Sequence, residues 1–228
     1  MLKIRLLALF IALISVSLVA QTKSLPRSTP EQEGVSSESI VNLIDAFEKK
    51  IEFVHSYMIV KNGKVVSEGW WDPYGPNIPH ELWSLSKSFT STAIGFAVEE
   101  GLIQIHDFVK DYFPEKSPEN PTWQLKQLRI IDLLTMSTGH TSEPRLGQSS
   151  DDWVKLFLES ELKLRPGTYF MYNTPATYML SAIIQKVTGE KLVDYLYPRL
   201  FEPLGIDRPC LLYTSPSHET RGNLVCRL

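Results

Sequence analysis

Two short stretches of this sequence place a serine three residues before a lysine, a pairing that can supply a nucleophile and its base. One pair is Ser84 and Lys87, and the other is Ser160 and Lys163. Residues three apart lie on one face of a helix, so the lysine amine can reach the serine hydroxyl. A neutral amine can then accept the hydroxyl proton while the oxygen attacks an ester or amide carbonyl. The spacing alone is a weak signal, because it occurs twice.

The surroundings of the two pairs differ. After Lys87 come eleven uncharged residues, Ser88 to Val98, and Gly101 follows where a helix would end. Apolar residues recur there at helical spacing: Leu85, Phe89, Ala93 and Ala97. The pattern predicts a buried helix over 84–100, with the Ser84 hydroxyl at the positive end of its dipole. Because burial disfavours the charged form of a lysine, we expect Lys87 to be partly neutral.

The second pair stands in acidic, polar sequence. Residues 150–162 have the pattern of an amphipathic surface helix, and Glu159 and Glu161 flank Ser160. We therefore expect Lys163 to remain an ordinary solvated cation. The environment, not the spacing, distinguishes the two pairs.

The elements that would position these residues follow from turn and cap signals. A helix of about fifteen residues is predicted to begin at a Ser37 cap. Asn62-Gly63 lies between two β-rich runs, which predicts a tight hairpin within residues 55–71. Asn173 or Thr174 is predicted to cap a helix that begins at Pro175 and stops at Gly189, and a further helix is predicted over 191–201. A hairpin followed by a run of helices indicates an α+β protein.

Several segments together resemble the serine β-lactamase and penicillin-binding-protein superfamily. The similarity is closest to its class C-like branch of family VIII-type esterases and D-amino peptidases, and it spans residues 30–207. The segments, in chain order, are "SLSKSFTSTAIGFAVEEGLIQIHD", "LLTMSTGH", "RPGTYFMYNTPATYMLSAIIQKVTG" and "LFEPLGI". The resemblance implies an antiparallel sheet flanked by helices, with an all-helical subdomain beside the site.

The resemblance also assigns roles to individual residues. Ser84 would be the acylating nucleophile, and Lys87 would accept its proton. Tyr172 matches the tyrosine of the second motif, Tyr-x-Asn, and would pass the proton to the leaving group. The motif asparagine is shifted here, because Thr174 stands two residues after the tyrosine and Asn173 one residue after it. Either side chain is a candidate for contacting the substrate amide.

The C-terminal part departs from the family. A third motif, Lys-Thr-Gly or His-x-Gly, and three central strands are expected after residue 207, and that strand would provide half of the oxyanion hole. One lost oxyanion donor lowers the rate by about 10²- to 10³-fold. We therefore expect this chain to fold poorly and to have little activity. Residues 210–228, which hold no periodicity or caps, are predicted to be a non-native or frameshifted tail after an incomplete hydrolase domain over 21–209.

The first twenty residues predict export to the periplasm or beyond. Lys3 and Arg5 precede an uncharged run from Leu6 to Ala20, the order found in a signal peptide cleaved after Ala20. A membrane anchor is the alternative, but a spanning helix needs about 20 apolar residues. We expect no stable membrane insertion after cleavage.

Composition excludes other classes of function. The net charge of −3 and the lack of a basic run with aromatics argue against nucleic-acid binding. No metal or other cofactor is predicted, because the histidines lack ligand spacing. A surface position is the default for His140, and a place at the rim of the site is the alternative. The expected substrate is a small-molecule or short-peptide ester or amide, with esters and small amides ranked before D-amino peptides and β-lactams. The alternative is a non-catalytic penicillin-binding-like module or an inactive fragment.

Overall fold

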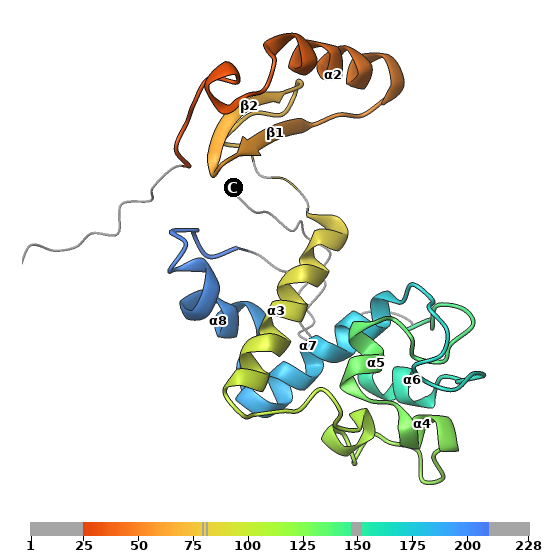
Figure 1. The fold of residues 1–228 in the computed structure, drawn as a ribbon. Coiled ribbons are helices and arrows are strands. Elements are labelled where there is room, and N and C mark those ends of the chain that lie inside the picture. The colour runs from red at the N-terminus through yellow and green to blue at the C-terminus, as the bar shows by residue number, and fades with distance from the viewer. Residues whose placement is uncertain (1–24, 79, 81, 147–151, 210–228) are drawn as a thin grey trace, which may run out of the picture. The chain divides into compact units, whose positions relative to one another are not determined.

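A computed structural model of the protein describes residues 25–78, 80, 82–146 and 152–209. The predicted signal peptide and the predicted tail lie outside these residues. The chain divides into two compact units, residues 1–76 and residues 77–228. In chain order the elements (Figure 1) are η1 (Glu31–Glu33), α2 (Ser37–Lys50), β1 (Ser56–Lys61), β2 (Lys64–Trp70), η2 (Trp83–Leu85), α3 (Ser86–Glu99), η3 (Val109–Tyr112), α4 (Trp123–Gln127), α5 (Ile130–Leu134), α6 (Trp153–Glu159), α7 (Thr174–Thr188), α8 (Leu192–Leu196) and the π-helical turn η4 (Tyr197–Phe201).

In the first unit, β1 and β2 form the predicted antiparallel hairpin. Its turn is Asn62 and Gly63, which both have positive φ, 52° and 74°. Paired positive φ values are typical of a type I′ turn, and Asn-Gly adopts them with little strain. Within the described residues the sheet has these two strands.

The N-cap of α2 lies one residue before the predicted one. Ser36 has an extended backbone, and its hydroxyl accepts a hydrogen bond from the Ser39 N–H at 3.2 Å. Ser37 is the first helical residue instead. Two adjacent serines are equally good caps by type, so the backbone conformation, and not the sequence, selects between them.

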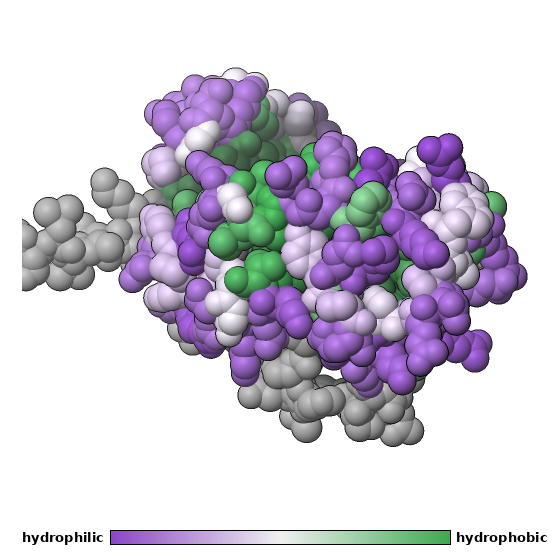
Figure 2. All heavy atoms as spheres, turned by 90° about the horizontal axis from the view of Figure 1, so that it is seen from below, coloured by the Kyte–Doolittle hydropathy of each residue, from purple (hydrophilic) through white to green (hydrophobic). Residues whose placement is uncertain are grey.

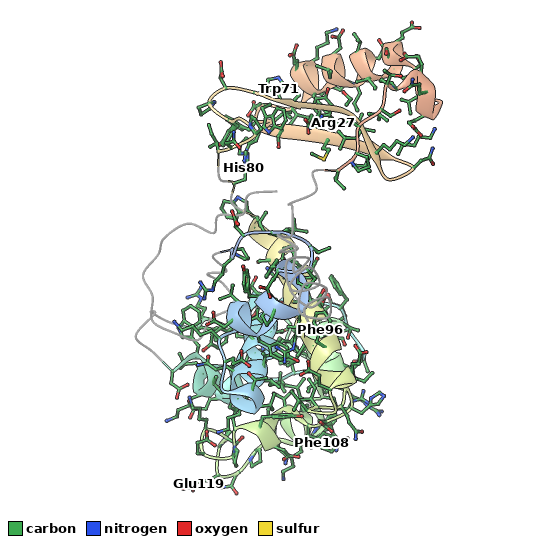
Figure 3. The ribbon with its side chains drawn as sticks, turned by 90° about the vertical axis from the view of Figure 1, so that its left-hand side faces the viewer. Arg27, Trp71, His80, Phe96, Phe108 and Glu119 are labelled. Carbon is green, nitrogen blue, oxygen red and sulfur yellow. The ribbon has the colours of Figure 1, made fainter. Side chains whose placement is uncertain are left out.

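Aromatic side chains join α2 to the hairpin. The ring centroid of Trp71 is 6.3 Å from that of Phe47 on the helix and 5.9 Å from that of Tyr57 on β1. Its side chain is labelled in Figure 3. The indole N–H also donates to Glu48 Oε1 at 3.3 Å. Trp71 is therefore a packing residue of this unit.

The core of the second unit is built on α3 and α7, which cross in Figure 1. All ten side chains from Pro175 to Ile184 are buried. The predicted stripe of α3 is only partly buried, because Ala93 and Ala97 are inaccessible while Leu85 is 51% exposed. The stripe therefore contacts the core toward the end of α3 and leaves its beginning open.

The ends of the helices follow local signals where these are strong. Asn173 caps α7, and Gly189 ends it with a φ of 75°, as predicted. The helices predicted over 150–162 and 191–201 are shorter, since α6 covers Trp153–Glu159 and α8 changes into η4 after Leu196.

Apolar side chains also remain on the surface, as the green areas among purple residues in Figure 2 show for one face. Among the helices of the described residues, none has the length and apolar character needed to cross a bilayer. In the same residues, no three His, Cys, Asp or Glu side chains gather as metal ligands would.

Candidate active site

Ser84 lies in the short 3₁₀ helix η2, which continues directly into α3. The residue before it, Trp83, has a φ of 44°, a left-handed conformation that is strained for a large side chain. The Trp83 carbonyl accepts a hydrogen bond from Ser86 Oγ at 2.7 Å, which holds this turn in place. The chain thus presents the Ser84 hydroxyl at the N-terminus of α3, where the helix dipole favours negative charge.

Lys87 lies on the first turn of α3, and its amine reaches back to the serine. Lys87 Nζ donates to Ser84 Oγ at 3.3 Å, so the pair predicted from the spacing forms. Lys87 is partly buried, whereas the Ser84 residue is exposed. The burial that we predicted for Lys87 is therefore only partial among the residues that the structure describes.

Tyr172 comes from the segment before α7, 88 positions along the chain, and contacts both residues. Its hydroxyl oxygen is 2.5 Å from Ser84 Oγ, and Lys87 Nζ is 5.2 Å from the centroid of its ring. Hydrogen bonds from Ser84 and then Lys87 lower the pKa of the Tyr172 phenol, because they stabilise the phenolate. The three residues singled out from sequence therefore meet at one point.

Asn173 and Thr174 do not share the exposure of Tyr172. The side chain of Asn173 is fully buried, and its Oδ1 accepts the Ala176 N–H of α7 at 3.0 Å. The Thr174 N–H donates to Glu143 Oε1 at 2.7 Å, and the charge of Glu143 opposes the lowering of the Tyr172 pKa. Contact of Asn173 or Thr174 with a substrate stays a prediction.

The surface position predicted for His140 is wrong. It is 3% exposed, in the loop after α5, and burial lowers its pKa to about 4. Its Nδ1 lies 2.8 Å from Thr138 Oγ1 and 3.3 Å from Asn173 Nδ2, and its Nε2 lies 2.7 Å from Ser160 Oγ. No local pattern signals this burial, because two of these three partners, Ser160 and Asn173, come from other segments of the chain.

Ser160, the serine of the second pair, is thus engaged inside the protein. Its hydroxyl donates to the Phe157 carbonyl at 2.5 Å and contacts His140. Lys163 is 57% exposed and forms an ion pair with Glu161 at 3.6 Å, as expected for a solvated cation.

A serine hydroxyl beside an amine and a phenol, at the start of a core helix, is the arrangement of a nucleophile with its proton-transfer groups. Comparisons with known proteins identify the family to which such a chain belongs. A model of the family described as Beta-lactamase matches residues 48–221. The chain therefore belongs to the Beta-lactamase family.

Among its curated relatives are proteins of Salmonella agona and Salmonella typhimurium, each named "Putative D-alanyl-D-alanine carboxypeptidase". Each is 23% identical over 214 residues, which is 80% of this chain and 49% of the relative. The chain thus spans about half the length of these relatives.

Two solved structures have the same fold. One is titled "Putative 6-aminohexanoate-dimer hydrolase from Bacillus anthracis", with a TM-score of 0.63, 20% identity and coverage of 82% of this chain and 54% of the other. The second is titled "Crystal structure of putative beta-lactamase from Bacteroides dorei DSM 17855", with a TM-score of 0.63, 18% identity and coverage of 76% and 53%. The β-lactamase-like fold expected from the resemblance is confirmed.

Proposed function

We propose that this chain is, or is part of, an exported serine hydrolase that cleaves an ester or amide through an acyl-enzyme on Ser84. One observation carries the proposal: the Ser84 oxygen lies 2.5 Å from the Tyr172 hydroxyl and 3.3 Å from the Lys87 amine. A serine hydroxyl is a weak nucleophile until an adjacent base accepts its proton. Tyr172 is close enough to Ser84 for direct proton transfer, whereas Lys87 forms a longer hydrogen bond to the same serine oxygen.

In acylation, Ser84 Oγ forms a bond to the substrate carbonyl carbon while its proton moves to the adjacent base. Tyr172 is the nearer acceptor, and its lowered pKa favours the phenolate that would take the proton. Lys87 donates a hydrogen bond to Ser84 Oγ, and its charge stabilises the Tyr172 phenolate. This order differs from the sequence expectation, in which Lys87 is the first acceptor.

The bond to the alcohol or amine then breaks, and the leaving group takes the proton back from Tyr172. In deacylation, a water molecule gives its proton to the same phenolate and its oxygen to the acyl carbon. The ester bond to Ser84 breaks, and the serine oxygen recovers the proton. Tyr172 thus acts as base and acid in turn, and no cofactor enters the balance.

Substrate choice follows the open geometry and the family. Esters and small amides rank first, because Ser84 is exposed and the motif asparagine is buried in the cap of α7. Peptides ending in D-amino acids rank second, since relatives at 23% identity carry the name of a D-alanyl-D-alanine carboxypeptidase. β-Lactams rank third. Export, from the first twenty residues, is part of the proposal.

Covalent labelling tests the proposal better than turnover, since it needs one reaction of Ser84 per molecule. We expect a fluorescent fluorophosphonate to label the purified chain, with the adduct on Ser84 by peptide mass spectrometry. Ser84→Ala should abolish the label, while Ser91→Ala, an exposed serine on the same helix, should retain it. A folded chain that takes no label, or labels equally after Ser84→Ala, would support a non-catalytic module instead.

A further inference from the structure

The segment that carries Tyr172 is tied to the loop after α5. The Met171 N–H donates to the Met136 carbonyl at 2.9 Å, and the Gly167 N–H donates to the Ser137 carbonyl at 2.7 Å. Met136 has a φ of 52°, a strained conformation for its residue type, which persists only where the surroundings enforce it. The loop 136–140 is therefore a fixed support on one side of Tyr172.

His140 completes this support, and its tautomer follows from its partners. The Ser160 hydroxyl donates its proton to the Phe157 carbonyl, so Ser160 Oγ accepts from the imidazole. His140 Nε2 must then carry the hydrogen, which leaves the lone pair on Nδ1. The contact is not a nucleophile–base pair, because the serine proton is directed away from the imidazole.

The Nδ1 side of His140 faces the cap of α7. Asn173 Oδ1 accepts the Ala176 N–H, which turns its amide nitrogen inward. Asn173 Nδ2 donates to Thr138 Oγ1 at 3.2 Å and lies 3.3 Å from His140 Nδ1, and Thr138 Oγ1 lies 2.8 Å from the same Nδ1. His140 is therefore linked to Asn173 both directly and through the Thr138 hydroxyl. Since Asn173 directly follows Tyr172, the tyrosine is held on both sides, through Met171 and through Asn173.

We propose that His140, as the neutral Nε2–H tautomer, is a positioning residue that holds Tyr172 against Ser84 by fixing Asn173. The role within the reaction rests on the proposed function. It has no equivalent in the roles that the resemblance assigns, which end at the tyrosine and the asparagine.

The surroundings keep this imidazole neutral. Burial alone lowers the pKa of His140 to about 4. The charged side chains on the neighbouring elements are engaged elsewhere: Glu143 with the Thr174 N–H, Glu159 with Lys155 at 3.8 Å, and Glu161 with Lys163 at 3.6 Å. Protonation of Nδ1 would put a hydrogen in place of the lone pair that faces Thr138 Oγ1 at 2.8 Å and Asn173 Nδ2 at 3.3 Å.

Two variants remove this link in different ways. His140→Leu removes the acceptor, and Asn173→Ser keeps a residue that caps α7 but removes the amide nitrogen. His140→Gln retains polar groups and is the conservative rescue. Ile184→Val, in the core of the same helix, is the matched control for lost packing.

The first readout is the pH titration of the Tyr172 phenol, followed by ¹³C NMR of labelled tyrosine and assigned with Tyr172→Phe. We expect its pKa to lie below 10 in the parent chain and in Ile184→Val, and to return toward 10 in His140→Leu and Asn173→Ser. The ¹⁵N shifts of His140 should report the Nε2–H tautomer at neutral pH. The second readout is the rate of fluorophosphonate labelling, which should fall about 10- to 100-fold in both variants and recover in His140→Gln.

The two readouts separate the inference from the proposed function. If the Tyr172 titration responds as described but Ser84 never takes the label, the positioning is confirmed and the hydrolase function is not. If Ser84 is labelled but the Tyr172 titration is the same in folded His140→Leu and Asn173→Ser, the inference is overturned. Loss of folding in both variants would also overturn it, because the network would then serve folding alone.

Discussion

The two Ser-x-x-Lys pairs of this chain have the same spacing and opposite surroundings. Ser84 begins a core helix, receives a hydrogen bond from Lys87 at 3.3 Å, and meets a phenol at 2.5 Å. Ser160 ends the short helix α6, where its hydroxyl donates to the Phe157 carbonyl. Its lysine, Lys163, forms an ion pair with Glu161. Among the described contacts, Lys163 makes no side-chain hydrogen bond to Ser160.

The difference arises from where each serine lies on its helix. At the N-terminus, the lysine three residues later lies on the next turn of the same helix and points back to the serine. At the C-terminus, the helix has ended before the lysine, so the shared face that the spacing implies does not exist. The position of the motif relative to the helix end therefore decides which lysine can reach its serine.

The largest expected difference between the pairs is in the two lysines. Lys87→Met should slow fluorophosphonate labelling of Ser84 by about 10²- to 10³-fold, because the Tyr172 phenolate that accepts the serine proton loses the hydrogen bond and the charge of Lys87. Lys163→Met removes an exposed ion pair of the kind that contributes about 0–1 kcal/mol, and should leave the rate within about twofold. Equal losses in the two variants would show that the contact at Ser84 is not the source of reactivity.

The two serines also differ in their contact with a phenol. Ser84 contacts Tyr172, whereas the described contacts of Ser160 include no tyrosine. Tyr172→Phe should lower the labelling rate by about 10²- to 10³-fold. In the parent chain the rate should rise with pH up to a pKa below 10, as the phenol becomes phenolate. That rise should be absent in Tyr172→Phe. A pH profile that keeps the same rise without the phenol would assign the base to another group.

A backbone contact fixes the second pair and gives a smaller, structural prediction. The carbonyl of Gly139 accepts from the N–H groups of Lys163 and Leu164, both at 3.0 Å. A Cβ on Gly139 would lie 2.4 Å from the Leu164 oxygen, and its φ is 94°. We expect Gly139→Ala to lower the free energy of unfolding by about 3 kcal/mol, through the clash and the strained conformation.

Gly189→Ala is the matched control for that substitution. Gly189 also has a positive φ, 75°, but a Cβ there meets nothing within 4 Å. We expect a loss of about 1 kcal/mol, from backbone strain alone. Urea unfolding of both variants measures the difference, and equal losses would mean that the contact between Gly139 and Leu164 relaxes at little cost.

Much of the site was predictable because its signals are local. The uncharged run after Lys87 and the glycine that follows it at position 101 indicate the helix, and Asn62-Gly63 indicates the hairpin. Tyr172 required more than local pattern, since it meets Ser84 from 88 positions away, and its prediction came from the resemblance. The contact between Tyr172 and Ser84 was therefore predicted from the order of the family motifs, because hydrophobic periodicity carries no information about it.

The environment of His140 was not predictable from the sequence. Its burial depends on Phe157, Ser160 and Asn173, which approach from other segments, and a polar loop gives no sign of them. The same limit explains Leu85, whose helical spacing fits a buried stripe although 51% of it is exposed. Periodicity predicts which residues share a face, but tertiary contacts decide whether that face is covered.

A last prediction, with a smaller effect than that at Gly139, concerns the pH dependence of folding, and it joins the two pairs through His140. Burial lowers the pKa of this imidazole from 6.5 to about 4, so the unfolded chain binds the proton first as the pH falls. Its contribution to stability is therefore complete above pH 6.5 and is lost progressively toward pH 4. For such a shift, the loss between pH 7 and pH 5 is about 2 kcal/mol. Urea unfolding at these two pH values should show that loss in the parent chain and a smaller one in His140→Gln. If both chains lose the same stability, the proton binds elsewhere, and Ser160 is not held by a neutral histidine.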